Sequence, residues 1–414
     1  MSQPRATRRS GAGQAELGGG ISRGLVLLLA IACGTAAANL YYAQPLLHTL
    51  GGAFGVSNAT AGLLITISQL GYVLGLALLV PLGDLHERRG LISATMLVTA
   101  AALALAAAAP AFAVMSGALA VVGVTSVVAQ IVVPMSSSLS AEHERGSVVG
   151  TVMSGLLIGI LLARTVSGLI AAAAGWRTVF WFAAAAMVLL AATLRRALPR
   201  VPPTTDLSYG GLLRSVLALV REEPMLRQRM MVGALGFGCF SALWTSLAFL
   251  LSGPPYGYGN AVIGLFGLVG VAGAVAASGA GRLADRGHNG RVTTVSILIM
   301  LASWGVMAFG QTSVVALIAG IALLDLGVQG LHISNQSAIY ALRPEARSRL
   351  TTAYMVAYFL GGATLSAISS SLYGSDGWGG ICVLGGATAL LALVGWVLTE
   401  AAARRRPDAA RAVV

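Results

Sequence analysis

The sequence contains few charged residues. Only 10% of its 414 residues are charged, whereas 57% are hydrophobic. A soluble chain of this length needs more polar residues to cover its surface. The composition therefore excludes a soluble protein and indicates a membrane protein.

Lysine is absent as well, so all 26 basic residues are arginines. The sequence lacks a glycine-rich phosphate loop ending in Lys-Ser/Thr, a zinc-ligand spacing and an activated nucleophile. These absences exclude ATP-driven transport and enzymatic catalysis, and they predict neither a cofactor nor a metal site. The three cysteines lie within apolar segments, where we interpret them as small core residues: Cys33, Cys239 and Cys382.

Apolar stretches long enough to cross a bilayer as helices occur along the whole chain. The first half contains six, at 22–42, 59–82, 90–109, 112–138, 147–171 and 176–194. The second half contains six more, at 230–252, 261–281, 291–310, 313–340, 350–373 and 379–399. The predicted fold class is therefore an all-α membrane protein with twelve transmembrane helices.

The arginines mark one side of the membrane. If the chain starts in the cytoplasm, all 26 basic residues except Arg164 and Arg177 fall in predicted cytoplasmic parts. Because cytoplasmic loops are enriched in basic residues, both termini are predicted to be cytoplasmic. This placement also accounts for the net charge of +12 without a nucleic acid partner.

The predicted spans form two six-helix bundles, at 22–194 and 230–400. The connection at 195–229 contains prolines and then an amphipathic stretch, which predicts a cytoplasmic linker with a helix on the inner membrane surface. Residues 1–21 are rich in Gly, Arg and Ser and are predicted to be disordered. The remaining residues, 401–414, are predicted to be a cytoplasmic tail.

A pattern of residues occurs twice, about 200 residues apart. Asp84, Arg145 and the pair Gly175-Trp176 recur in the same order as Asp285, Arg347 and Gly377-Trp378. Repeats that run in the same direction are typical of duplicated membrane bundles, which often transport solutes. The spacing therefore predicts two halves related by a pseudo-twofold axis.

Both copies contain a charged loop between two spans. The loops at 81–90 and 281–287 resemble the signature loop of the major facilitator superfamily, although Leu85 and Glu87 depart from its pattern. The resemblance implies the fold of that family and a cytoplasmic gate motif, whose acidic and basic side chains bind helix ends of the opposite half. A charge cluster that only orients the protein is the alternative. The predicted gate residues are Gly83, Asp84, Arg88, Arg89, Arg145, Gly281, Asp285, Arg286 and Arg347.

Two further stretches narrow the resemblance. The end of the first span, 38–47, and the glycines of the fifth span between Gly155 and Gly168 are similar to the efflux branch of that superfamily. This branch contains bacterial sugar exporters, purine-ribonucleoside exporters and drug–proton antiporters. The resemblance implies export of a small molecule by a monomer.

The tenth span is the most polar of the twelve. Asp325, Gln329, His332 and Gln336 follow each other at spacings of four, three and four. At about 100° per residue these side chains lie on one face of a helix, which lipid does not tolerate. The stripe is therefore predicted to line a water-filled cavity or to pack against polar partners.

Asp325 is the only acidic residue near the middle of a predicted span. Burial of a carboxyl group favours its protonated form, so an Asp that faces each side of the membrane in turn can carry a proton. Asp325 is the first candidate for proton coupling, and His332 is the second because an ordinary histidine titrates near neutral pH. A permanently paired Asp325 and a satisfied interior His332 are the alternatives.

Arg164 is the only basic residue that lies away from the ends of a predicted span. Such a residue indicates a functional site. It can bind an anionic or hydroxyl-rich substrate, pair with Asp325 or extend to the outer membrane surface. Efflux members of the superfamily usually carry an Arg in the fourth span, which this sequence lacks, so any proton relay here differs from that pattern.

In this fold the first and fourth helices of each half surround the central cavity. Polar and aromatic residues occur in the corresponding spans, where helix packing is the alternative to substrate binding. The predicted cavity residues, besides Arg164, Gln329 and Gln336, are Asn39, Tyr42, Gln130, Trp244 and Thr245.

Together these features predict a secondary transporter of the bacterial inner membrane. It exports a small solute by alternating access, in exchange for protons, and its partners are the solute, protons and the lipid bilayer. Uptake or uniport without proton coupling is the alternative within transport. A membrane receptor or scaffold built on a transporter fold is the alternative from another class.

Overall fold

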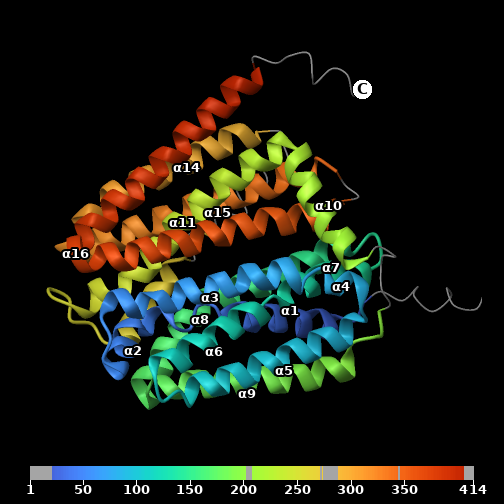
Figure 1. Cartoon of the computed structure of the whole chain (residues 1–414), viewed down its shortest axis with the longest axis horizontal. Helices are drawn as coiled ribbons and strands as arrows, with labels where there is room; N and C mark the ends of the chain where they lie inside the picture. The colour runs from blue at the N-terminus through green and yellow to red at the C-terminus, as the bar shows by residue number, and fades with distance from the viewer. Residues whose placement is uncertain (1–20, 202–207, 271–272, 274–287, 344–345, 405–414) are drawn as a thin grey trace, which may run out of the picture.

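The computed structural model describes residues 21–201, 208–270, 273, 288–343 and 346–404. The predicted gate residues Gly281, Asp285 and Arg286 lie outside them. Within the described residues the chain is built of helices and their connections, without a β-strand. Two bundles lie side by side, with α1 to α9 below and α11 to α16 above in Figure 1.

The first bundle contains one 3₁₀-helix, η1, and nine α-helices. Their bounds are α1 Arg23–Ala38, η1 Gln44–Leu46, α2 Leu47–Phe54, α3 Asn58–Leu78, α4 Leu82–Leu85, α5 Arg88–Ala107, α6 Phe112–Thr125, α7 Val128–Ser138, α8 Arg145–Ala174 and α9 Trp176–Ala197. The predicted span at 112–138 is thus divided between α6 and α7.

The connection contains α10, and the second bundle follows it. The bounds are α10 Tyr209–Glu222, α11 Pro224–Ser252, α12 Asn260–Leu265, η2 Phe266–Gly270, α14 Asn289–Met307, η3 Ala308–Gln311, α15 Val314–Tyr340 and α16 Arg347–Arg404. Helix α16 bends at Gly377, whose φ of 59° lies in the left-handed region that glycine adopts without strain. The bend separates the two last predicted spans.

Nine helices of the described residues are long and apolar enough to cross a membrane. One of them is the bent α16, which covers two predicted spans. Shorter apolar helices, Arg23–Ala38 and Asn260–Gly270, occupy the positions of the first and eighth predicted spans. The chain is therefore a multi-pass membrane protein, and the count of twelve stays a prediction.

Several helices begin at a serine. The side chains of Ser22, Ser57, Ser208 and Ser313 each accept a hydrogen bond from a backbone amide three residues later. Such caps satisfy an amide that has no partner within the helix. Glu87 plays the same part for α5, because its carboxylate accepts from the amides of Arg89 and Gly90 at 2.9 Å. Glu87, which departs from the family pattern, thus caps α5.

Glycines bring helices of the first bundle into backbone contact. A Cβ atom at Gly34 in α1 would lie within 2.4 Å of the Gly155 carbonyl oxygen in α8. Gly155 and Gly159 therefore pack within the first bundle, and only a residue without a side chain fits there.

Helix α3 packs on α16 and helix α8 on α12, so two helix pairs join the bundles. In the second pair, a Cβ atom at Gly168 would lie within 2.3 Å of the Asn260 carbonyl oxygen. Among the described residues, three hydrogen bonds between side chains also cross between the bundles, from Thr49 to Asn260, from Thr66 to Ser366 and from Gln69 to Ser241.

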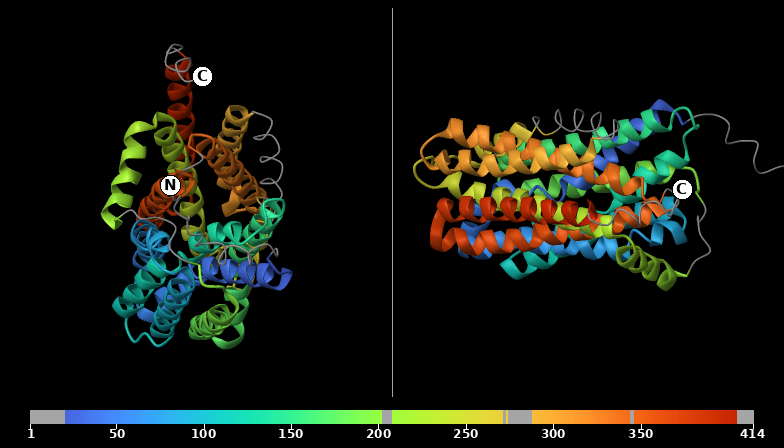
Figure 2. Two further views of the ribbon diagram at one scale, coloured as in Figure 1. Left: turned by 90° about the vertical axis from the view of Figure 1, so that its right-hand side faces the viewer. Right: turned by 90° about the horizontal axis from the view of Figure 1, so that it is seen from above.

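The bundle has two distinct ends. We call the end where α8 and α16 begin the Arg347 end, and the end where α2 lies the Thr49 end (Figure 1). Helix α10 joins the bundles at the Arg347 end. The Tyr209 hydroxyl donates to the Leu78 carbonyl oxygen at 3.0 Å, and Arg343 pairs with Glu222 at 3.0 Å and with Glu223 at 2.7 Å. Figure 2 shows the two bundles and α10 from other sides.

Candidate functional site

A cavity of about 400 Å³ lies between the bundles at the Arg347 end. Residues from α3, α7 and α8 of the first bundle face residues from α15 and α16 of the second. Its volume is within the range of small-molecule sites. The polar residues that line it are Gln130, Ser137, His332, Gln336, Tyr340, Arg347, Ser348, Thr351 and Thr352.

A second cavity of about 70 Å³ lies further from the Arg347 end. Arg164 from α8 and Asp325 and Gln329 from α15 line it, among apolar neighbours such as Phe240. At 1.5 Å per residue, Asp325 lies about 16 Å along α15 from Gln336. The predicted polar stripe of α15 therefore faces the interior along its length, with Asp325 and Gln329 at the small cavity and His332 and Gln336 at the large one.

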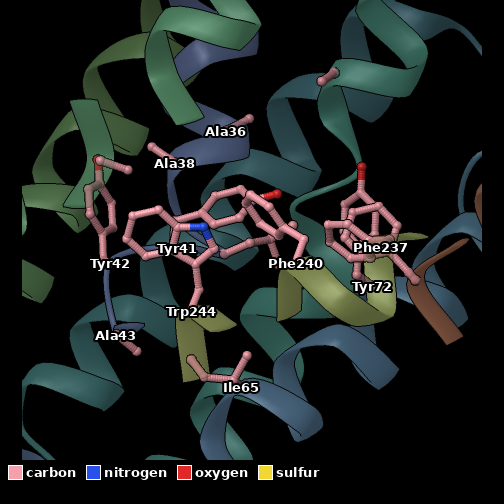
Figure 3. Packing of buried hydrophobic residues seen from close by; sticks show 14 of the residues in the cluster. Ala36, Ala38, Tyr41, Tyr42, Ala43, Ile65, Tyr72, Phe237, Phe240 and Trp244 are labelled. Carbon is pink, nitrogen blue, oxygen red and sulfur yellow. The ribbon is translucent and has the colours of Figure 1, made fainter. Parts of the chain in front are cut away.

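The Arg164 side chain is enclosed by aromatic rings. It is only 3% exposed, and its guanidinium carbon lies 3.9 Å from the centre of the Trp244 ring, 4.8 Å from that of Tyr41 and 5.3 Å from that of Phe240. Figure 3 shows these three aromatic residues gathered in the core. A guanidinium group over a ring face is attracted by the ring's quadrupole. The side chain thus points into the protein and does not extend to a membrane surface.

The polar partner of Arg164 is Gln44. Its Nε donates a hydrogen bond of 2.6 Å to the Gln44 side-chain oxygen. Gln44 begins the 3₁₀-helix that follows α1, so the turn after α1 positions this oxygen. Sequence reasoning did not select Gln44, Tyr41 or Phe240, because no spacing links these residues to Arg164.

Asp325 lies beside Arg164 without a contact ion pair. Both residues line the small cavity and interact electrostatically, yet no nitrogen–oxygen pair of the two falls within 4.0 Å in the described structure. Asp325 is 5% exposed, and a Cβ atom at Gly270 would lie 2.8 Å from its Oδ2 atom. The carboxyl group is therefore held between η2 and the aromatic cage of Arg164.

Three buried polar atoms at this place have no hydrogen-bond partner within the described part of the chain. They are Nη2 of Arg164, Nε1 of Trp244 and Oδ1 of Asp325. Trp244 lies near the Asp325 carboxyl group, but not in hydrogen-bonding geometry. Buried polar atoms are almost always paired, and an unpaired one costs about 1–3 kcal/mol. Their clustering indicates a site that binds a polar group.

His332 joins a second polar network. Its Nδ1 atom lies 3.1 Å from the Tyr354 hydroxyl, and its ring packs 4.9 Å from that of Tyr358. The Asn335 side chain donates to the same hydroxyl at 3.4 Å. His332 thus has a hydrogen-bond partner, as a satisfied interior histidine does, and it also lines the large cavity, as a proton-coupling residue would.

The remaining predicted cavity residues are divided. Gln130 lines the large cavity, and its side-chain nitrogen donates to the Tyr72 hydroxyl at 3.4 Å. Asn39, Tyr42 and Thr245 line neither cavity. Asn39 donates to the Met187 sulfur at 3.5 Å, the Tyr42 side chain faces a groove between α1, α8 and α9, and Thr245 bonds to Ser366 at 2.9 Å. Asn39 and Thr245 thus contact neighbouring helices of their own bundles.

The described gate residues lie at the Arg347 end. Arg88 pairs with Asp84 at 3.0 Å and donates to the Gly83 carbonyl oxygen at 2.9 Å, while Arg89 donates to the Leu198 carbonyl oxygen at 3.3 Å. Arg145 is exposed at the start of α8. Arg347 donates to the Tyr340 carbonyl oxygen at 3.3 Å and lines the mouth of the large cavity.

Arg229 is a buried cation that the sequence reasoning placed in the cytoplasmic connection. Helix α11 begins earlier, at Pro224, so Arg229 lies within it and is only 4% exposed. It donates to Thr293 at 2.7 Å and to Asn335 at 3.2 Å. Pro224 after two glutamates is a helix-start signal that could have moved the boundary.

Two apolar helical bundles that enclose a polar-lined cavity form the architecture of a membrane transporter. Residues 27–364 match the model of the Major Facilitator Superfamily, and the chain belongs to this family. The protein is therefore a non-enzymatic transporter, as predicted, and its all-α fold is that of the family.

Several relatives are themselves transporters by name. The chain is 50% identical over 376 residues to “Uncharacterized transporter YgaY” of Escherichia coli O157:H7, covering 91% of this chain and 95% of that protein. It is 35% identical over 400 residues to “Probable transporter SCO4007” of Streptomyces coelicolor, covering 95% and 91%. It is 26% identical over 296 residues to “Chloramphenicol resistance protein” of Streptomyces lividans, covering 70% and 74%.

Solved structures share the fold at low sequence identity. A bacterial homolog to the human lysosomal transporter Spinster, in an inward-facing and occupied conformation, matches with a TM-score of 0.72 and 13% identity over 92% of this chain and 96% of that one. The nucleoside transporter NupG matches with a TM-score of 0.73 and 14% identity over 90% and 99%.

Proposed function

We propose that this transporter exports a small solute from the bacterial cytoplasm in exchange for protons, by alternating access. The observation that carries the proposal is the buried Asp325 carboxyl group, which has one unpartnered oxygen and lies beside Arg164 at the small cavity between the bundles. One relative is named for resistance to chloramphenicol, which supports export as the direction.

Alternating access requires the bundles to separate at one end at a time. At the Thr49 end, Thr49 donates to Asn260 at 2.8 Å and Thr165 donates to the Gly264 carbonyl oxygen at 3.0 Å, so the bundles are joined there. At the Arg347 end the 400 Å³ cavity separates them. With cytoplasmic termini, this arrangement corresponds to a state that accepts solute from the cytoplasm.

Proton coupling follows from how the charges are divided between the bundles. Arg164 belongs to the first bundle, whereas Asp325 and Trp244 belong to the second. An ionised Asp325 attracts the Arg164 guanidinium group, and protonation removes that attraction. Because the site is buried, the loss is large compared with the same change in water. A proton on Asp325 thus changes the force that holds the two bundles together.

The test measures export in everted membrane vesicles with and without a pH gradient. Chloramphenicol is the first solute to try, and proton movement is followed with a pH-sensitive dye. Uphill export that needs the gradient is expected from the natural protein. Flux that ignores the gradient would favour uptake or uniport without protons.

A matched pair of variants assigns the proton to a residue. Asp325→Asn is expected to abolish gradient-driven export while solute exchange continues. Asp376→Asn makes the same chemical change at an exposed acid in the bend of α16 and is expected to leave export unchanged. Uphill export by Asp325→Asn at the natural rate would remove Asp325 from the mechanism.

A further inference from the structure

The two cavities differ in size, so each suits a different part of one ligand. The large one, about 400 Å³, is enough for a compact organic molecule. The small one, about 70 Å³, has room only for a group of a few atoms. They follow each other along α8, where Leu156 lines the large cavity and Leu157 the small one. Because Gln329 of the small cavity and His332 of the large one are three residues apart on α15, a ligand body in the first cavity lies within about one helical turn of the second.

The unpartnered atoms define the chemistry of that end group. Arg164 Nη2 and Trp244 Nε1 are hydrogen-bond donors, and Asp325 Oδ1 is an acceptor when ionised. All three side chains are at least nine-tenths buried, at 3%, 3% and 5% exposure. A complementary group offers an acceptor to the donors and a donor to the carboxylate, as a hydroxyl or a primary amide does.

The charges at the cavities define the charge of the ligand. Among the described residues that line them, Arg164 and Arg347 carry guanidinium groups and Asp325 carries the carboxyl group. A cationic end group would be attracted by Asp325 but repelled by Arg164, an anionic one the reverse, and either would lose its hydration on burial. Like charges at about 4 Å repel by roughly 4 kcal/mol under the dielectric conditions of a partly wet site. An uncharged end group avoids both costs.

The large cavity is lined by both polar and aliphatic side chains, which suits an amphipathic ligand body. Neutral amides and hydroxyls, such as those of Gln130, Gln336 and Thr351, are interleaved with aliphatic side chains. We infer that the solute is an uncharged amphipathic molecule whose hydroxyl or amide end is bound by Arg164, Trp244 and Asp325. This inference rests on the proposed transport function and names its substrate class.

The test places a cysteine at the small cavity and compares thiol reagents of similar size that differ in charge. Gln329→Cys is made in a background where Cys33, Cys239 and Cys382 are alanine, and Ser147→Cys, on the exposed start of α8, is the reference. Purified protein is treated with the trimethylammonium-ethyl methanethiosulfonate cation, with its uncharged isostere 3,3-dimethylbutyl methanethiosulfonate and with the sulfonatoethyl methanethiosulfonate anion. Rates at Gln329→Cys are divided by those at the reference, and melting temperatures confirm that each variant is folded.

The neutral reagent is expected to react fastest. Repulsion by Arg164 is expected to slow the cation by about tenfold or more relative to the reference site. Adding Arg164→Gln should raise the cation's rate and lower the anion's. Gln336→Cys, in the large cavity, should discriminate less between the charged and neutral reagents. It lies about 11 Å from Gln329 along α15, at 1.5 Å per residue, and is thus further from Arg164.

Three outcomes would overturn the inference: a cation or anion that reacts as fast as the neutral reagent, no modification by any reagent, or rates that ignore Arg164→Gln. The measurement needs neither a pH gradient nor solute flux. A transporter that proves not to use protons leaves the result unaffected, so failure of the inference and failure of the proposed function are told apart.

Discussion

The guanidinium carbon of Arg164 lies 3.9 Å from the centre of the Trp244 ring. Arg164 belongs to α8 and Trp244 to α11, so this stack joins the first bundle to the second. It lies beside the Asp325 carboxyl group, where the two bundles share the small cavity. The stack that joins the bundles and the proposed proton site thus lie at the same place.

Removing the stacked ring tests this contact. Trp244→Ala is expected to lower the free energy of unfolding by about 3–5 kcal/mol for the lost side chain and by a further 0.5–2 kcal/mol, roughly, for the lost cation–π contact. Trp244→Phe keeps a ring and should cost less. Trp181→Ala removes a half-exposed tryptophan from α9 and is the matched control. Thermal unfolding in one detergent measures all three, and equal losses for Trp244→Ala and Trp181→Ala would contradict the expectation.

Locking the Thr49 end tests alternating access. Thr49 donates to Asn260 at 2.8 Å, so cysteines at both positions can be joined by a short bifunctional methanethiosulfonate. The cross-link is expected to stop export, and reduction should restore it, because the solute can no longer leave at this end. The single variant Thr49→Cys with the same reagent is the control. Continued export by the cross-linked protein would show that the Thr49 end is not a gate.

The length of the apolar stretches predicted most helices, since a span must satisfy its own backbone in lipid and therefore leaves a local pattern. The pair Gly377-Trp378 marked the bend in α16 through a repeat of Gly175-Trp176. The break between α6 and α7 was not predicted, because Thr125 and Val128 lie in an uninterrupted apolar stretch. Arg229 was placed at the edge of the connection, whereas it is buried within α11, because the charge of an arginine does not distinguish a buried residue from a linker residue.

The site was predictable only along single helices. The face shared by Asp325, Gln329, His332 and Gln336 follows from helical spacing. The cage around Arg164 combines Tyr41, Gln44, Phe240 and Trp244 from segments that are far apart in the sequence. Such neighbours are set by how helices pack, and one sequence without a structure contains no spacing that reports them.

Arg343 forms ion pairs between the second bundle and the connection. Replacing it tests whether these pairs hold α10 in place. It pairs with Glu222 at 3.0 Å and with Glu223 at 2.7 Å, at the junction of α10 and α11. Arg343→Gln is expected to release this junction and to speed proteolysis of the connection a few-fold. High salt should have the same effect on the natural protein, because exposed charges are screened. Arg349→Gln, without an ion pair in the described structure, is the control. Unchanged proteolysis would mean that the pairs do not hold α10.

A methyl group added at Gly270 tests how closely Asp325 must be held. The new Cβ would lie 2.8 Å from Asp325 Oδ2 and 3.0 Å from a methyl carbon of Leu161, so the carboxyl group has to move. Overpacking of this kind costs roughly 1–3 kcal/mol, and a loss of that size in the transport step lowers its rate by about fivefold or more. Gly270→Ala is therefore expected to lower gradient-driven export in everted vesicles by at least that factor. Gly305→Ala, at a position where a Cβ meets no atom within 4 Å, should keep full export and melt no lower than the natural protein. If both variants export equally well, the position of the Asp325 carboxyl group does not limit transport.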